Sequence, residues 1–235
     1  MKKQEKNIKG YRISGDRPPV ITQIAYQKKD KLRASVFIAG EFAFGINVAT
    51  IERFRLRKGD ELTEQLLEDL RGVDYRISAK RVGSKFLNAR RRTEKEVREK
   101  LLKSEFDDTI TQETIEDLVD AKLIDDEAYT QAFIHDKRIA KPISSRQLAN
   151  ELRRKGVRKE IIVTALATSD ESETEEDRAT LAAKKKWELL LRREPDERKR
   201  TQKLIAFLGS RGFPFDVIKR IARNISTKIE AEEFE

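Results

Sequence analysis

Clusters of lysine and arginine recur along the chain and could bind the phosphates of a nucleic acid. The first is Arg90-Arg91-Arg92, directly before Thr93, and the second is Arg153-Arg154-Lys155, directly before Gly156. Guanidinium and ammonium groups bind phosphate oxygens without reading base sequence, and such binding weakens steeply as salt rises. The same cations could instead only complement the negative end of a helix dipole. The candidate contacts are Arg90, Arg91, Arg92, Lys95, Arg98, Lys137, Arg138, Arg146, Arg153, Arg154, Lys155, Lys184, Lys185, Arg192 and Arg193.

Residue types that support catalysis or metal binding are few. Asp125-Asp126 is a possible acid/base or metal-binding pair, but we expect both carboxylates to cap the start of a helix, where backbone N–H groups lack partners. His135 is the single histidine, expected on a helix surface, and cysteine is absent, so no histidine metal cluster or Ser-His-Asp triad is predicted. No glycine-rich phosphate loop is found. The sequence therefore predicts a binding protein that is not an enzyme and needs no metal or cofactor.

The charge of the chain favours an anionic partner. The formal net charge is +9 and the pI is about 9.6, with 40% charged and 37% hydrophobic residues among 235. Residues 76–103 carry eleven basic and three acidic side chains, residues 104–136 one and eleven, and residues 137–160 nine and two. Such blocks could face both a polyanion and a charged protein, or pair with one another on solvated helix faces. No apolar run reaches the roughly 18 residues of a membrane span, so we expect a cytoplasmic protein without membrane contact.

The N-terminal part of the chain predicts a small sheet. We expect residues 1–19 to form a disordered basic arm. In the following segment, residues 20–74, the apolar period is first two, and turn residues separate three short runs, which predicts a three-stranded antiparallel meander followed by helix. Phe42, Phe44 and Ile46 are expected on one face, where they pack on the following helices or, alternatively, stack on nucleic-acid bases.

An apolar pattern recurs three times in the helical remainder. Each copy has five apolar residues separated by 4, 5, 4 and 5 positions, which places them on matching faces of two helices on either side of a tight break. Glycine stands at the break in copies two and three, and Asp107-Asp108 is expected to start the next helix in copy one. The copies are Val97-Leu101-Phe106-Ile110-Ile115, Leu148-Leu152-Val157-Ile161-Leu166 and Leu204-Leu208-Phe213-Val217-Ala222.

One more amphipathic helix precedes each pair, so the repeating unit has three helices. The stretch Ser169 to Asp177 is interpreted as a linker with a capped helix start, and Trp187 as a core residue of the third repeat. The fold class is therefore mainly α, with tandem three-helix bundles in an elongated curved rod and a small N-terminal antiparallel meander. The expected repeats are residues 75–121, 122–170 and 171–228, followed by a C-terminal tail at 229–235.

We interpret the basic clusters as equivalent features of successive repeats. Arg153-Arg154-Lys155 is taken to match Arg90-Arg91-Arg92, and Lys184-Lys185-Lys186, with Arg192-Arg193, to extend the pattern into the third repeat. Recurrence at matching places favours a shared role in phosphate binding over a purely local one.

Three motifs follow one another along the helical part of the chain: Arg92-Thr93-Glu94-Lys95-Glu96-Val97, Leu123-Ile124-Asp125-Asp126-Glu127-Ala128-Tyr129 and Glu151-Leu152-Arg153-Arg154-Lys155-Gly156-Val157. In this order and spacing they resemble the RecX family, the bacterial regulators of the RecA recombinase. The resemblance covers about residues 75–228, and the segment before it is similar to the N-terminal extension of longer members from low-GC Gram-positive bacteria. Ser104-Glu105 departs from the pattern, because a glycine usually ends this helix in the family.

The resemblance implies a specific function, which the composition alone does not indicate. The family binds in the helical groove of the RecA filament on DNA, inhibits its ATP turnover and strand exchange, and tempers recombination, DNA repair and the SOS response. We therefore expect a monomeric regulator of RecA that also contacts single- and double-stranded DNA through phosphates. The alternative is an architectural or transcriptional DNA-binding protein, built from helical repeats, that acts without RecA.

Overall fold

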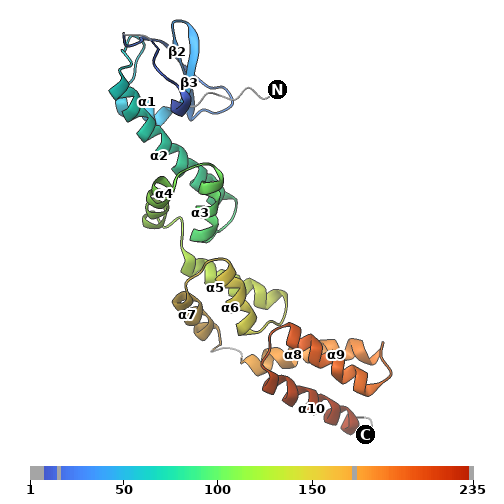
Figure 1. Cartoon of the computed structure of the whole chain (residues 1–235). Coiled ribbons are helices and arrows are strands. Elements are labelled where there is room, and N and C mark those ends of the chain that lie inside the picture. Colours follow the sequence, from blue (N-terminus) through green and yellow to red (C-terminus); the bar gives the residue numbers. More distant parts are fainter. Residues whose placement is uncertain (1–7, 15–16, 171–173, 233–235) are drawn as a thin grey trace. The chain divides into compact units, whose positions relative to one another are not determined.

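The computed structural model describes residues 8–14, 17–170 and 174–232, which form two compact units (Figure 1). The first unit comprises residues 1–90 and 98–123, and the second residues 91–97 and 124–235. The first contains a 3-10 turn (Ile8–Gly10), strands β1 (Ile21–Tyr26), β2 (Arg33–Ile38) and β3 (Glu41–Asn47), and helices α1 (Val48–Phe54), α2 (Glu64–Ala89) and α4 (Asp108–Asp120). The second contains α5 (Asp126–Ala140), α6 (Ser145–Arg154), α7 (Lys159–Asp170), α8 (Glu175–Leu191), α9 (Glu197–Ser210) and α10 (Phe215–Glu232). Helix α3 (Glu94–Lys103) begins in the second unit and ends in the first.

The three strands form the predicted antiparallel meander, in the order β1-β2-β3. Alternation along each strand directs every second side chain to the inner face. Val36, Phe44 and Ile46 are fully buried there and form one core with Leu67 and Leu70 of α2. The sheet and the first helices therefore share a hydrophobic core.

Phe42 does not share the face of Phe44 and Ile46, which corrects the prediction. A bulge leaves Ala43 without a partner in register and pairs Phe42 with Phe37. One extra residue reverses the alternation of side chains along a strand. Phe42 is therefore on the outer face, 41% exposed, with its ring 6.1 Å from that of Phe37.

Part of the predicted disordered arm is ordered in the structure. Ile8 is buried in the core of the sheet, and the Tyr11 ring lies 5.1 Å from the Phe44 ring. Arg71 of α2 donates hydrogen bonds to the carbonyl oxygens of both Ile8 and Tyr11. Burial of these two apolar side chains stabilises the core. The sequence did not predict it, because the residues around them are mostly polar or basic. Residues 1–7 and 15–16 of the predicted arm lie outside the described residues.

Helix α2 joins the sheet to the first repeat without a break, so the expected boundary between residues 74 and 75 falls inside a helix. Asp74 is buried and accepts hydrogen bonds from the Asn47 N–H at 2.7 Å and from the Thr50 hydroxyl at 3.0 Å. The next residue, Tyr75, donates to the Glu105 carbonyl oxygen at 2.8 Å. Neighbouring residues of one helix thus hold the sheet on one side and the first repeat on the other.

The three-helix repeats are confirmed. All the predicted apolar positions of the three copies are buried except Ile110 and Leu166, which are half-buried. Gly156 and Gly212 adopt the left-handed conformation at the breaks, with φ of 85° and 79°. Trp187, 5% exposed, lies in the core of the third repeat, as predicted.

The predicted helix starts are also confirmed where the structure describes them. The Asp107 carboxylate caps α4 by accepting from the Ile110 N–H at 2.9 Å. Thr174 caps α8 through a reciprocal pair of hydrogen bonds with Asp177. Residues 171–173 of the expected linker lie outside the described residues, and α10 continues through Glu232, into the segment predicted as a tail.

At the first break a glutamate replaces the glycine of the other two copies, and this predicts a stabilising substitution. Glu105 has a φ of 65°, a conformation that costs a residue with a Cβ about 1 kcal/mol more than glycine. Glu105→Gly is therefore expected to raise the free energy of unfolding by about 1 kcal/mol in chemical denaturation followed by circular dichroism. Glu99→Gly, at an exposed position inside α3, should lower it by about 1 kcal/mol. Equal losses from both substitutions would contradict this account.

Candidate nucleic-acid interface

Two junctions of similar chemistry lie within the second unit, and the first of them brings several of the candidate cations together. At the first junction the start of α3 meets the turn after α6. The Thr93 hydroxyl donates to the Lys155 carbonyl oxygen at 2.7 Å, and the Glu94 N–H donates to the Asp126 carboxylate at 2.9 Å. The Lys155 ammonium lies 3.2 Å from the Glu96 carboxylate. One free N–H group at the helix start, that of Glu94, is thereby satisfied by the following repeat, while the N–H of Glu96 is satisfied locally by the Thr93 hydroxyl.

The second junction repeats this arrangement one repeat later. Here the start of α6 meets the turn after α9. The Ser144 N–H donates to the Arg211 carbonyl oxygen at 3.4 Å, and the Ser145 N–H donates to the Glu175 carboxylate at 3.2 Å. Arg211 in turn donates to the Pro142 carbonyl oxygen at 2.7 Å. A carboxylate from the first residue of α5 or α8 thus binds the start of the preceding middle helix in both junctions.

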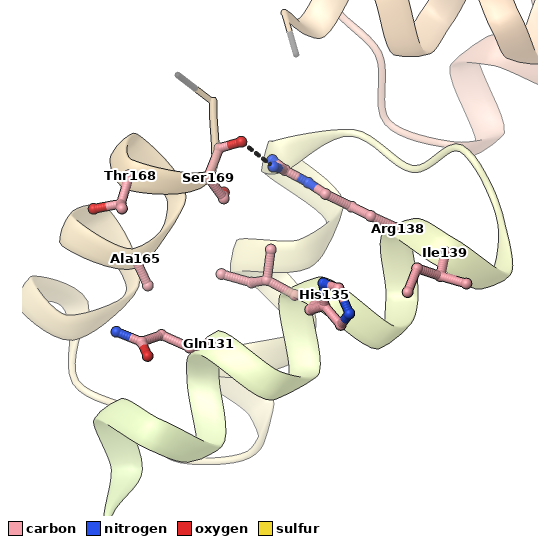
Figure 2. Close-up of a pocket in the computed structure, with 8 residues that line it drawn as sticks. Gln131, His135, Arg138, Ile139, Ala165, Thr168 and Ser169 are labelled. Atoms are coloured by element: carbon pink, nitrogen blue, oxygen red, sulfur yellow. Dashed lines mark hydrogen bonds between the residues drawn. The ribbon is translucent and has the colours of Figure 1, made fainter. Parts of the chain in front are cut away.

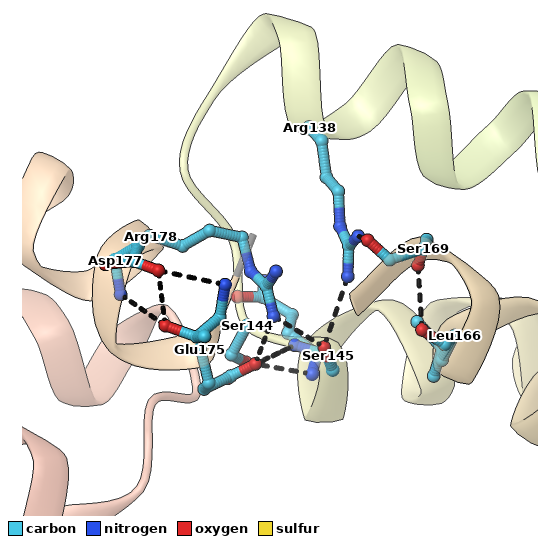
Figure 3. Close-up of polar contacts among 10 residues, drawn as sticks. Arg138, Ser144, Ser145, Leu166, Ser169, Glu175, Asp177 and Arg178 are labelled. Atoms are coloured by element: carbon cyan, nitrogen blue, oxygen red, sulfur yellow. Dashed lines mark hydrogen bonds and ion pairs between the residues drawn. The ribbon is translucent and has the colours of Figure 1, made fainter. Parts of the chain in front are cut away.

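Arg178 is specific to the second junction (Figure 3). Its side chain is 2% exposed and donates to the Ser145 hydroxyl at 3.1 Å and to the Glu175 carboxylate at 2.8 Å. Burial of a guanidinium requires such charged and polar partners. At the corresponding place in α5 the chain has Tyr129, which is also buried. Arg178 was not among the predicted site residues, because nothing in its local sequence distinguishes it from a solvated cation.

The glycine of each turn is required for two reasons: its φ is positive, and the neighbouring repeat packs too closely for a side chain. A Cβ at Gly156 would lie 2.5 Å from the Cβ of Lys95, and a Cβ at Gly212 would lie 2.6 Å from the Ser144 hydroxyl oxygen. Neither distance is compatible with unperturbed packing. The backbone of each turn therefore approaches the neighbouring repeat more closely than any side chain would allow.

Asp125 and Asp126 have different roles, although both were predicted to cap one helix. Asp125 does so, because it accepts from the Ala128 N–H at 2.8 Å at the start of α5. Asp126 instead accepts from the N–H of Glu94, at the start of α3. Burial, assisted by the charge of Glu94, raises the pKa of the Asp126 carboxyl above its ordinary value. The prediction of a local cap was therefore correct for the first residue and wrong for the second, whose partner is remote in sequence.

The raised pKa of Asp126 predicts a stability that depends on pH. Because the folded state holds this proton more tightly, the contribution of the carboxyl to stability is largest below its ordinary pKa of about 3.9 and is lost as the pH rises through the raised value. Asp126→Asn keeps an oxygen for Glu94 but carries no charge. The free energy of unfolding of this variant, relative to wild type, is expected to rise with pH above about 4 in urea titrations. Asp30→Asn should show the opposite trend, and at pH below about 4, because hydrogen bonding to Arg81 lowers the pKa of Asp30. A difference for Asp126→Asn that does not vary with pH would contradict the assignment.

Three of the predicted phosphate contacts are engaged in contacts within the protein. Lys137 lies 2.6 Å from the Glu151 carboxylate, and Arg138 donates to the Ser169 carbonyl oxygen at 2.7 Å. Lys155 binds Glu96 at the first junction. Burial alone would lower the pKa of the Lys155 ammonium, but its contacts with Tyr129 and Glu96 outweigh burial and raise it. We therefore assign Lys137 and Arg138 to the internal structure of the second repeat, and Lys155 to the first junction.

Other candidate cations are exposed at the end of α6 and beside it. Arg153 and Arg154 occupy the last turn of α6, and the ammonium of exposed Lys95 lies 3.1 Å from the Arg154 carbonyl oxygen. Arg146 is exposed in the first turn of the same helix. Arg158, which was not among the predicted contacts, is exposed just beyond the turn. Its place in the basic block at residues 137–160 is the sequence feature that could have indicated it.

The predicted equivalence of the first two basic clusters is wrong. Arg90, Arg91 and Arg92 precede the start of α3, whereas Arg153 and Arg154 end α6. The first cluster precedes a middle helix and the second ends one, so they are not at matching places in the repeat. The first junction nevertheless brings Lys95, which follows the first cluster, next to the second cluster.

The remaining candidates lie on the helices of both units. Arg90 and Arg91 are exposed, Arg92 is half-buried, and Arg98 donates to Gln112 at 2.7 Å. Four exposed cations of α8 and its C-terminal end are Lys184, Lys185, Arg192 and Arg193.

Some of the alternating charge blocks pair with one another in the first unit. Arg76 of α2 lies 3.1 Å from the Glu113 carboxylate of α4, and Lys80 lies 3.2 Å from that of Asp117. Both pairs are largely exposed, so each contributes little to stability. The interpretation of the blocks as solvated, mutually paired helix faces therefore holds for these residues.

A cavity of about 590 Å³ lies between α5 and α7 (Figure 2). Its wall is apolar at Ile134, Ile139 and Ala165, and Arg138 closes one end by its hydrogen bond to Ser169. His135 is exposed at its edge, on the helix surface, as predicted. Within the described residues, no group of three or more histidine or acidic side chains could hold a metal ion, and no helix is long and apolar enough to cross a membrane.

Comparison with known proteins gives a consistent assignment over the chain. Four family models match: the regulatory protein RecX N-terminal domain at residues 19–63, and the first, second and third three-helix domains of RecX at residues 79–118, 125–166 and 173–221. A crystal structure of regulatory protein RecX is 28% identical with a TM-score of 0.66, covering 86% of this chain and 98% of that one. RecX from Lactobacillus salivarius, 24% identical with a TM-score of 0.57 over 66% of this chain and 99% of its own, has the same fold.

Curated relatives extend the match to nearly the whole chain. Regulatory protein RecX of Clostridium beijerinckii is 31% identical over 91% of this chain and 99% of its own length. The protein of the same name from Clostridium botulinum strain Eklund 17B is 33% identical over 86% of this chain and 94% of its own length. The chain therefore belongs to the RecX family of regulatory proteins.

Proposed function

We propose that this protein inhibits the RecA recombinase by binding in the groove of the RecA–DNA filament. There it suppresses ATP hydrolysis and strand exchange, and so modulates recombinational DNA repair and the SOS response. Membership of the RecX family supports this role, as do the exposed cations, which suit a filament that presents DNA phosphates. We expect it to act as a monomer and without catalytic residues of its own.

The observation that carries the proposal is the grouping of exposed cations at the first junction. Lys95 from the start of α3 lies beside Arg154 from the end of α6, with Arg153 in the same turn. Because the junction is held by partly buried hydrogen bonds, these charges are presented by a fixed backbone. Prearranged cations lose less conformational freedom on binding phosphate than cations on a mobile segment.

The direct test is DNA-dependent ATP hydrolysis by RecA. Rising concentrations of the purified protein are expected to slow ATP turnover on single-stranded DNA until it is largely suppressed. Undiminished turnover at saturating protein would refute the proposal. Binding to bare DNA as tight as to RecA-coated DNA would instead favour the alternative, a helical-repeat DNA-binding protein that acts without RecA.

A further inference from the structure

The outer face of the N-terminal sheet carries an aromatic pair next to a flat patch. Phe37 and Phe42 oppose each other on β2 and β3, with rings 6.1 Å apart at 79°. In the middle of the same face, Ser35 of β2 lies between Ala25 of β1 and Gly45 of β3. These three residues are small, and longer polar side chains from the same face lie over them. Gln27 donates a hydrogen bond to the Ser35 hydroxyl at 3.3 Å, and Gly45 is buried.

A guanidinium lies on this patch because Gly45 has no side chain. A Cβ at Gly45 would be 2.9 Å from the Nη2 atom of Arg33. The Arg33 side chain as a whole is half-buried. A guanidinium is suited to a phosphate oxygen because it presents several N–H donors in a fixed planar arrangement. Arg33 and Phe37 are four residues apart on one strand, a separation of about 13 Å.

The turn beside Arg33 adds positive charge. Lys28, Lys29 and Lys31 are exposed there, while the one acid of the turn, Asp30, forms an ion pair with Arg81 of α2. Hydrogen bonding to Arg81 also lowers the pKa of Asp30, so the negative charge of Asp30 is paired with Arg81. At the opposite turn Glu41 is exposed next to Phe42, so the positive charge is concentrated at the Arg33 end of the face.

We propose that this face is a binding site for single-stranded DNA, with bases stacked on Phe37 and Phe42 and phosphates held by Arg33 and the lysines of the turn. Exposed aromatic rings next to a cationic track are the combination that binds unpaired bases without sequence preference. Bases of a duplex already stack on one another and are not available to these rings. The site deepens the proposed function by naming a separate DNA contact, but it does not require RecA.

The test compares binding of a single-stranded and a duplex probe to the full-length protein. Fluorescence anisotropy would use a labelled oligonucleotide of about 12 thymidines, within the range that one sheet-based site covers, and a duplex of equal length. Phe37→Leu with Phe42→Leu keeps apolar side chains but removes both rings. The single-stranded probe is expected to bind this variant about tenfold more weakly, while duplex binding stays unchanged. Arg33→Gln should lower the slope of log affinity against log salt for the single-stranded probe by about one unit, the contribution of one phosphate contact.

Tyr26→Leu is the matched control, because Tyr26 is 66% exposed on the same sheet but pairs with Ala34, whose side chain is on the inner face. It should leave binding of both probes unchanged. If the double variant loses its circular dichroism spectrum, Phe42→Leu alone tests the site, since Phe42 is already 41% exposed.

Three results would overturn the inference. They are unchanged single-strand binding by the leucine variants, an equal loss for single-stranded and duplex probes, and an equal loss from Tyr26→Leu. Unchanged oligonucleotide binding with weaker association to RecA would mark the face as a protein contact instead. Because the oligonucleotide assay contains no RecA, its outcome is separate from that of the ATP hydrolysis test.

Discussion

A protein with Arg153→Glu and Arg154→Glu is expected to bind the RecA–DNA filament at least about 100-fold more weakly than wild type at low salt. Both side chains are exposed in the last turn of α6 and are not part of a core. Each phosphate contact contributes about one unit to the slope of log affinity against log salt, so the variant should lose about two units of slope. Reversal also introduces repulsion between carboxylates and phosphates. The measurement is a salt titration of binding by anisotropy with labelled filament.

A charge-matched control is available elsewhere on the chain. Arg198 and Lys199 are adjacent, exposed cations in the first turn of α9 and are not among the candidate contacts. Arg198→Glu with Lys199→Glu makes the same change in net charge. Equal losses from the two double variants would mean that net charge, and not the end of α6, determines binding.

Lys155 is left out of this experiment for a structural reason. The sequence presents Arg153-Arg154-Lys155 as one cluster, but the Lys155 ammonium pairs with Glu96 and lies 5.7 Å from the centre of the Tyr129 ring. Reversing its charge would place two carboxylates together at the first junction. A loss of binding would then report a damaged junction as well as a lost phosphate contact.

The features that the sequence predicted are those with local causes. The three copies of the apolar pattern follow from helical periodicity, and the caps at Asp107 and Asp125 depend on N–H groups three residues away. Trp187 belongs to the core because of its place on one helix face. Periodicity and capping operate within one or two helical turns, so a single sequence carries enough information for them.

The features that the sequence did not predict depend on partners remote along the chain. Asp126 caps a helix that begins 32 residues earlier, and a single unpaired residue in β3, Ala43, turns Phe42 to the other face. The basic clusters seemed equivalent because their compositions agree, although they occupy different places in the repeat. The composition shows which charged residues are present. Which of them are exposed depends on contacts at the junctions, which the sequence alone does not show.

The second large effect is expected at the junction between the second and third repeats. Gly212→Ala should lower the free energy of unfolding of the third repeat by about 3 kcal/mol, combining the cost of a left-handed alanine with that of overpacking. A Cβ there would lie 2.6 Å from the Ser144 hydroxyl oxygen and 3.2 Å from the Gln147 Cβ. Ser144 is fully buried, and its hydroxyl caps α6 by accepting from the Gln147 N–H at 3.0 Å. The side chain therefore cannot move aside without losing the cap.

Gly209 provides the matched control within the same helix end. It lies in α9, exposed, and a Cβ there would meet nothing within 4 Å. Gly209→Ala is therefore expected to raise the free energy of unfolding by about 0.5 kcal/mol through helix propensity. Trp187 is the single tryptophan and lies in this core, so its fluorescence in urea reports both variants. Effects of the same sign would contradict the assignment.

A double-mutant cycle separates the clash from the backbone strain. Ser144→Ala removes the hydroxyl that a Cβ at residue 212 would meet, at the cost of about 1 kcal/mol for the lost cap. If the clash contributes, Gly212→Ala should cost less in the Ser144→Ala background than in wild type, by about 1 kcal/mol or more. Strict additivity would assign the whole loss to the left-handed backbone. The junction would then require glycine for its φ of 79° alone, and not for the close approach of the second repeat.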